Sequence, residues 1–286
     1  MSGNVWFGAI ALALAMMSSA AAEIFDTSKY PDLKGQWDRF VVRGLPGQPS
    51  FDQTKPWGRG QQAPLTAEYQ AILEASIADQ ESGGLGNSAE HVMCRGAGMP
   101  FMMVGFRPLE FVVTLGTTYV LIADFDPLRR IFTDGRDWPA EIEPTIQGYS
   151  IGKWIDEDGD GKFDVLEVET RAFKGKRVFD ISGLPLHRDN RSVFKERIFV
   201  DKNDSNLLHD EITVIDNALT RPWTVDKRYV RSANLHAQWP EFICNEENGQ
   251  VMIGGEHYYL SSAGLLMPVR KDQAPPDLKY FKRPQK

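Results

Sequence analysis

The sequence is short of cysteine, and after its first 22 residues it has no long apolar run. Cys94 and Cys244 are its only cysteines, and no group of cysteines and histidines has the spacing of a zinc site. A helix needs about 20 apolar residues to cross a bilayer, and no stretch after residue 22 meets that need. We therefore expect neither a zinc centre nor a membrane span in the main part of the chain.

Basic residues are also few relative to acidic ones. The chain has 32 Lys and Arg against 39 Asp and Glu, a formal net charge of -7. Binding DNA or RNA requires a basic face that displaces counterions, so nucleic acid is not expected as a partner. Hydrophobic residues make up 42% of the chain, which is ample for a core, and the length fits one large all-β domain or two small ones.

Recognised catalytic patterns are missing as well. The sequence has no Ser-His-Asp order and no glycine loop that could cradle a phosphate. The histidines are scattered along the chain: His91, His187, His209, His236 and His257. Standard hydrolase and nucleotide-binding functions are therefore not favoured.

The first 22 residues have the pattern of a cleavable secretory signal. The apolar segment 5–17 is too short to span a bilayer, and Ala20 and Ala22 stand at the small-residue positions that a signal peptidase requires. We expect cleavage before Glu23 and a periplasmic or secreted protein. The alternatives are an uncleaved N-terminal tether and a short hydrophobic helix.

The two cysteines predict a single disulfide, because an oxidising compartment favours bonding of two cysteines that both survive signal removal. A bridge between Cys94 and Cys244 would restrain the unfolded chain by roughly 4 to 5 kcal/mol in the entropy model. The alternatives are a buried reduced pair and a nucleophilic cysteine near His91.

Residues 23–90 are expected to form an arm and one helix. Residues 23–64 are rich in Pro, Gly and polar side chains, with a strand-like island at 36–42, as in an arm that lies over a scaffold. Apolar residues then recur at helical spacing from Leu65 to Ile77, with Thr66 as a cap and Gly83 as a stop.

Beyond residue 100 the pattern changes to that of strands. Runs rich in β-branched and aromatic residues alternate with turns, at 109–114, 117–123, 129–133, 150–155, 163–172, 193–200, 207–215, 223–231 and 251–260. So many strands in an open sheet would leave exposed edges, which favours closure. We expect an all-β fold with minor α content, an antiparallel meander closed into a lipocalin-like barrel over residues 91–286. A β-sandwich is the alternative.

Residues 156–164 form the one strong local motif. Carboxylates stand at alternate positions, and Gly161 falls where the chain must turn sharply, as in the calcium loop of an EF-hand. The flanks read as strands, so the loop resembles the calcium-binding hairpins of integrin-type repeats. The expected ligands of a structural calcium ion are Asp156, Asp158, Asp160, Lys162 through its backbone carbonyl, Asp164 and, less favoured, Glu167. The alternative is a solvated acidic turn of the Asp-Gly kind.

Several short motifs follow one another after residue 90. They are Gly-Met-Pro at 98–100, Arg-Arg-Ile at 129–131, Asp-Gly-Arg at 134–136, Ser-Ile-Gly-Lys-Trp at 150–154, Glu-Arg at 196–197, Arg-Pro-Trp-Thr at 221–224 and Cys-Asn-Glu-Glu-Asn at 244–248, with Asp-Leu-Lys-Gly-Gln-Trp at 32–37 near the start. In these motifs the chain resembles a largely uncharacterised family of exported proteins from proteobacteria and acidobacteria. The resemblance implies an exported, barrel-like fold and brings no settled activity.

The chain departs from this family's pattern in two places. Relatives tend to have His before Ser-Ile-Gly, where this chain has Tyr149, so a role built on a histidine there does not transfer. Relatives make a short turn after the tryptophan, where this chain carries the acidic loop. The calcium site would therefore be a local addition.

Charged residues inside strand patterns are the remaining candidates for chemistry. Glu196 alternates with Phe194 and Ile198, which places a carboxylate on an apolar face, and His209 shares a face with Glu211. Such groups inside a barrel must be paired or functional, because an unpaired buried charge costs several kcal/mol. The candidate acid-base residues are Tyr149, His187, Glu196, His209, Glu211 and Arg136.

Two functions are compatible with these residues. The first is a small-molecule protein whose barrel pocket takes an apolar or aromatic compound, as a cofactor-independent lyase or isomerase or as a carrier. The second is a calcium-stabilised interaction module whose arm docks a partner. An enclosed polar cluster that opens to solvent would favour the first, and a solid apolar core with an exposed hydrophobic stripe would favour the second.

Overall fold

The computed structural model describes residues 25–41, 62–88, 96–104, 107–124, 128–234, 236–240, 249–254, 256–261 and 263–274. The expected signal segment 1–22, His91, Cys94 and Cys244 lie outside these ranges. The signal cleavage and the disulfide therefore stay predictions.

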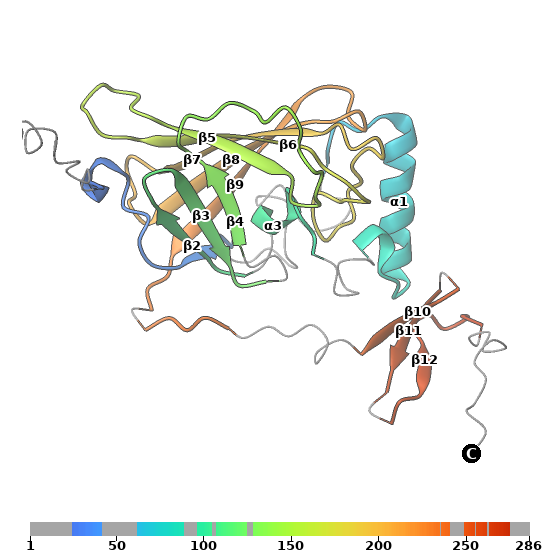
Figure 1. The fold of residues 1–286 in the computed structure, drawn as a ribbon. Helices are drawn as coiled ribbons and strands as arrows, with labels where there is room; N and C mark the ends of the chain where they lie inside the picture. The colour runs from blue at the N-terminus through green and yellow to red at the C-terminus, as the bar shows by residue number, and fades with distance from the viewer. Residues whose placement is uncertain are drawn as a thin grey trace, which may run out of the picture.

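A closed barrel forms the body of the protein (Figure 1). Within the described residues it has nine strands: β1 (Trp37–Arg39), β2 (Leu109–Val113), β3 (Thr117–Ile122), β4 (Leu128–Phe132), β5 (Tyr149–Ile155), β6 (Val165–Arg171), β7 (Val193–Val200), β8 (Leu207–Ile215) and β9 (Trp223–Arg231). Closure leaves no strand of this sheet without a neighbour on either side. The expected barrel is confirmed, and the sandwich alternative is not found.

One strand pair departs from the expected antiparallel meander. β4 and β5 run parallel, with Ile131 opposite Ser150 and Phe132 opposite Ile151, whereas the other neighbours in the barrel are antiparallel. Two parallel strands cannot be joined by a tight hairpin, and the connection 133–148 returns the chain to the starting end of β5. The expectation of an entirely antiparallel order was wrong at this pair.

The ends of the chain also differ from the expected strand assignment. The island at 36–42, expected in the arm, supplies β1, which pairs with β9 through Trp37 opposite Arg231 and closes the barrel. The run 251–260, expected as one barrel strand, is two strands of a separate sheet, β10 (Gln250–Ile253) and β11 (Glu256–Leu260), completed by β12 (Leu266–Pro268). Gly254 has a φ of 60° between them, a left-handed conformation that suits glycine in a tight turn.

The predicted helix is α1 (Ala67–Glu81). The Thr66 side chain accepts a hydrogen bond from the Tyr69 N–H at 3.4 Å, and Leu73 and Ile77 are buried, as the spacing predicts. Arg270 bonds to Asp79 at 3.0 Å and so links α1 to the chain after β12. The shorter helical turns are η1 (Thr27–Lys29), η3 (Gly86–Ser88) and α3 (Phe101–Val104).

Short helix α3 is part of the core. All four of its residues are buried, and the hydroxyl of Tyr229 on β9 donates to the Met103 carbonyl. The core therefore combines strand side chains with a segment that carries the Gly-Met-Pro motif. Among the described residues, no helix combines the length and the apolar composition required to cross a bilayer.

Candidate ligand-binding site

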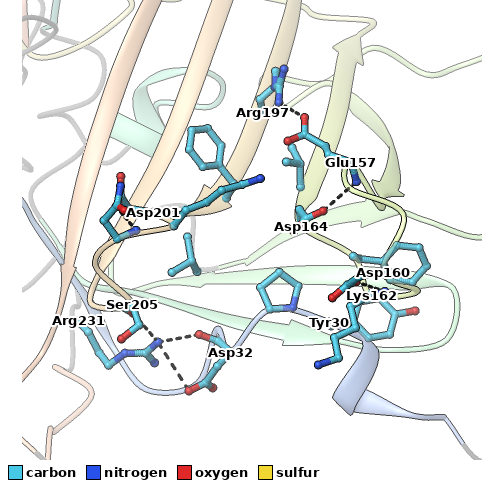
Figure 2. A pocket seen from close by; sticks show the side chains of 17 residues that line it. Tyr30, Asp32, Glu157, Asp160, Lys162, Asp164, Arg197, Asp201, Ser205 and Arg231 are labelled. Carbon is cyan, nitrogen blue, oxygen red and sulfur yellow. Dashed lines mark hydrogen bonds and ion pairs between the residues drawn. The ribbon is translucent and has the colours of Figure 1, made fainter.

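Two cavities adjoin on the outer side of the barrel, the larger along β5, β6, β7 and β8 and the other at the ends of β6 and β7. The larger has a volume of about 750 Å³ and is lined by Tyr30, Thr133, Gly135, Arg136, Ile151, Gly152, Lys153, Trp154, Phe163, Glu167, Val168, Glu169, Lys195, Glu196, Arg197, Glu211 and Thr213. The other, of about 690 Å³, lies beside the acidic loop (Figure 2). Tyr30, Phe163 and Arg197 line both cavities and form the boundary between them.

The larger cavity gathers residues from three of the short motifs. Asp-Gly-Arg supplies Gly135 and Arg136, Ser-Ile-Gly-Lys-Trp supplies residues 151–154, and Glu-Arg supplies residues 196–197. The first two motifs meet because β4 pairs with β5 and Arg136 bonds to Tyr149, and Glu-Arg joins them because β6 connects β5 to β7 in the sheet. Eight of the 17 lining residues are charged, and the apolar and aromatic ones among them are Tyr30, Ile151, Trp154, Phe163 and Val168.

Arg136 is held rigidly at one end of this cavity. Its Nε donates to Asp134 Oδ1 at 2.8 Å, its Nη2 to Asp134 Oδ2 at 2.6 Å and its Nη1 to the Tyr149 hydroxyl at 3.2 Å. The guanidinium also lies 3.9 Å from the ring centroid of Phe132, a cation–π distance. Its hydrogen bonds to Asp134 lower the pKa of that carboxyl to about 2.

A buried ion pair joins β4 to β7 inside the barrel. Arg129 donates from Nη1 and Nη2 to the two carboxylate oxygens of Glu196, at 2.8 and 2.5 Å, and also bonds to Thr170 at 3.0 Å. Both members of the pair have side chains at most 2% exposed. Burial opposes the charge of Arg129, but the Glu196 carboxylate outweighs it, and the pKa of Arg129 rises above its usual value.

A second buried pair continues this network. Asp210 on β8 lies directly opposite Lys227 on β9, and both are at most 1% exposed. Among the described residues neither carboxylate oxygen of Asp210 has a hydrogen-bond partner, and burial with the nearby Glu196 raises its pKa well above the usual range. Burial, followed by the charge of Arg39, lowers the pKa of Lys227 to about 7.

The smaller cavity opens between the acidic loop and the turn after β7, as Figure 2 shows. Arg197 bonds to Glu157 at 2.5 Å on one side, while Arg231 bonds to the carbonyls of Asp32 at 2.7 Å and Ser205 at 3.1 Å on the other. Charged side chains of both signs therefore line this cavity together with Tyr30 and other apolar side chains.

The acidic loop brings three carboxylates together. Asp156, Asp158 and Asp164 each offer an oxygen within 4.8 Å of the others, which is a geometry able to hold a hard cation. Asp160 lies outside this group and accepts a hydrogen bond from the Lys162 N–H at 2.8 Å, and Glu167 lies on β6 opposite Arg197. Three of the predicted ligands therefore converge, and Asp160 and Glu167 do not join them.

The predicted acid-base residues separate into two groups. Arg136, Glu196 and Glu211 line the larger cavity, and Tyr149 bonds to Arg136, although the Glu196 carboxylate faces Arg129 inside the barrel. His187 does not line either cavity: its Nδ1 lies 3.0 Å from Asp189 in the loop beside α1.

His209 and Glu211 require a correction. They share a face, as predicted, but it is the outward face of β8, where His209 lies 3.0 Å from Asp226 and stacks on Phe199. The enclosed positions of β8 are Leu208, Asp210, Ile212 and Val214. Both faces of this strand carry apolar residues, so the alternation alone did not identify the inner one.

The sequence reasoning missed Asp210, Lys227 and Arg129. The register offered a usable signal, because a carboxylate between Leu208 and Ile212 has the same pattern that identified Glu196 between Phe194 and Ile198. Arg129 lies within one of the short motifs, but its pairing with Glu196 depends on strands that are distant in the sequence.

No family model matches the chain, and no curated protein is similar to it in sequence. The fold and the two cavities define a closed β-barrel with a charged, partly apolar depression along one side.

Proposed function

We propose that the protein is an exported small-molecule-binding barrel that takes an aromatic or otherwise apolar compound in the larger cavity. The observation that carries this proposal is the convergence of three separate motifs on one cavity of about 750 Å³. A volume in this range suits a drug-sized ligand. The cavity is lined by Tyr30, Trp154 and Phe163, which can pack against a flat apolar molecule.

Binding is better supported than turnover. A general acid-base catalyst at neutral pH needs a group that titrates there and reaches the ligand. Lys227 has such a pKa, but its side chain is buried in the barrel and does not line the cavity. Asp210, whose pKa burial raises, is also buried and does not line it. We therefore propose a carrier or sensor function first, with lyase or isomerase chemistry as a property to be measured in the same experiments.

Titration of the isotope-labelled protein with a panel of small aromatic compounds tests the proposal by NMR. We expect chemical-shift changes at the amides of Thr133, Ile151 and Lys153 for the compounds that bind. Turnover of each compound is followed in parallel by chromatography.

A matched pair of variants locates the binding. Thr213 and Thr224 face each other across β8 and β9 with their hydroxyls 2.8 Å apart, but only Thr213 lines the cavity. Thr213→Trp should weaken binding about tenfold by filling the cavity, and Thr224→Trp should leave it unchanged. If no compound shifts the cavity amides, or if both variants behave alike, the proposed function is wrong.

A structural calcium ion in the acidic loop is a second proposal, favoured by the convergence of Asp156, Asp158 and Asp164. Calcium suits this site because it takes carboxylate and carbonyl oxygens in flexible geometry. The ion would stiffen the β5–β6 hairpin at the rim of the smaller cavity, which Asp164 lines. Calorimetry with calcium against chelator tests it, and an unchanged melting temperature would contradict it.

A further inference from the structure

The Arg136 end of the larger cavity presents hydrogen-bond donors. A guanidinium has five N–H groups. The three side-chain bonds to Asp134 and the bond to Tyr149 use the Nε hydrogen, shared between both Asp134 oxygens, and one hydrogen on each terminal nitrogen. Among the described residues, the second hydrogen on each terminal nitrogen has no partner, and the side chain is 39% exposed.

Tyr149 is not itself a lining residue, but it adds a donor directly beside Arg136. Its hydroxyl oxygen accepts a bond from Arg136, so its own hydrogen can be given to a further acceptor. The ring centroid lies 5.0 Å from that of Phe132, and the Arg136 guanidinium lies 3.9 Å from the Phe132 centroid. The donors are therefore fixed in position before any ligand arrives, which reduces the entropy lost on binding.

The cavity has more cationic side chains in its lining than carboxylates outside the buried pair. Its lining includes four cationic side chains, Arg136, Lys153, Lys195 and Arg197, against the three carboxylates Glu167, Glu169 and Glu211 outside the buried pair. Lys153 lies on the same outward face of β5 as Tyr149, four residues further along the strand. An anionic group at the Arg136 end would meet the free guanidinium hydrogens, although the Arg136 charge is shared with Asp134, and the lining as a whole has one more cation than carboxylates outside the buried pair.

We propose that the ligand of this cavity is an aromatic acid whose carboxylate binds to Arg136 and Tyr149. The inference rests on the proposed function and adds the chemical class of the ligand. Charge-assisted bonds of a carboxylate to a guanidinium are among the stronger polar contacts in proteins, and the arginine geometry is specific for this group.

Benzoate and benzamide test this inference, because they differ in charge and hardly in shape. We expect benzoate to bind at least tenfold more tightly than benzamide, as measured by NMR titration. Arg136→Met should remove this preference, and Tyr149→Phe should reduce it about threefold. Arg130→Met is the control, since Arg130 lies near the same Phe132 ring but does not line the cavity.

The outcomes separate this inference from the proposal on which it rests. If neutral aromatic compounds shift the cavity amides but benzoate has no advantage, the carboxylate assignment is wrong and the binding function stands. If Arg130→Met reduces benzoate binding as much as Arg136→Met, diffuse charge accounts for the preference and the assignment is again wrong. If no compound of either kind binds, both fail. Circular dichroism of each variant confirms that a loss is not due to unfolding, and Tyr149→Phe gives an independent readout if Arg136→Met does not fold.

Discussion

The same strands of this barrel carry charges on both faces, and the two faces use them differently. On the enclosed face, Glu196 and Asp210 are almost completely buried: Glu196 is paired with Arg129, whereas burial raises the pKa of Asp210. On the open face, Arg197 and Glu211 are about 40% exposed and belong to a ladder of alternating signs. Adjacent residues in sequence thus differ in environment because strand side chains alternate.

The position of a charged residue, and not its type, therefore decides what it contributes to stability. A buried ion pair loses solvation that its own attraction must replace, so removal of one partner is costly. An exposed pair is already solvated, and its loss changes little.

Removal of Glu196 should give the largest effect. Glu196→Ala leaves the Arg129 guanidinium buried without its carboxylate, and we expect a loss of about 3 to 5 kcal/mol in the free energy of unfolding. Chemical denaturation measures the loss. The double variant Arg129→Met with Glu196→Leu should recover part of it, because neither member of the pair then leaves an unpaired buried charge. A loss below about 1 kcal/mol for Glu196→Ala would show that water reaches the pair.

Calcium binding to the acidic loop should raise the free energy of unfolding by less than Glu196→Ala lowers it and by more than the outward-facing variants change it. Saturation at 100 times the dissociation constant adds about 2.7 kcal/mol, which raises the melting temperature. Asp158→Asn should reduce this shift more than Asp160→Asn, because Asp158 belongs to the convergent group and Asp160 does not. Equal responses of the two variants would contradict the ligand assignment.

Lys227 should make stability depend on pH. Its pKa is about 7 in the folded protein and about 10.4 in the unfolded chain. Between these values the unfolded state binds the additional proton, so this residue's contribution to stability increases with pH, by at most about 1.4 kcal/mol per pH unit.

Lys227→Met isolates that contribution. The stability of the wild type relative to the variant should increase from pH 7 to pH 10, while the same comparison for Lys195→Met on the open face stays flat. The raised pKa of Asp210 makes its own contribution to stability fall as pH rises, which would reduce the slope attributed to Lys227. The Lys195→Met control would still show no slope. Parallel curves for the wild type and Lys227→Met would show that the lysine keeps its charge in the folded state.

The open face should give the smallest effects. We expect Glu211→Gln and Lys195→Gln each to change the free energy of unfolding by less than about 0.5 kcal/mol, because exposed ion pairs are weak. Thermal denaturation with both variants checks this. A loss above about 2 kcal/mol from either would mean that the outward ladder is a structural element of the barrel.

The sequence predicted most of the barrel because alternation and turn residues are local signals. Eight of the barrel strands lie where the runs from 109 to 231 placed them, and α1 begins after Thr66 as its cap predicts. The inward position of Glu196 followed from Phe194 and Ile198. The acidic loop was placed between two strands from its flanks alone.

What the sequence could not provide are the features that depend on distant segments. β1 has only three residues, and its role becomes evident only when β9 is beside it. The parallel pairing of β4 and β5 depends on the path of a long connection. The face of β8 was ambiguous because Leu207 and Ile215 compete with Leu208 and Val214, and Asp210 was overlooked for that reason.

The three residues of β1 have a consequence for how the chain folds. Ribosomes deliver β1 before any other barrel strand, but its main partner β9 is the last barrel strand to be made. The pairing of Trp37 with Arg231 therefore joins the two ends of the barrel sequence and cannot form during most of synthesis. Contacts so distant in sequence form slowly, since the intervening chain must first lose its freedom. Until β1 pairs with them, β2 and β9 have unpaired strand edges. A chaperone that binds strand edges would therefore act before this pairing forms.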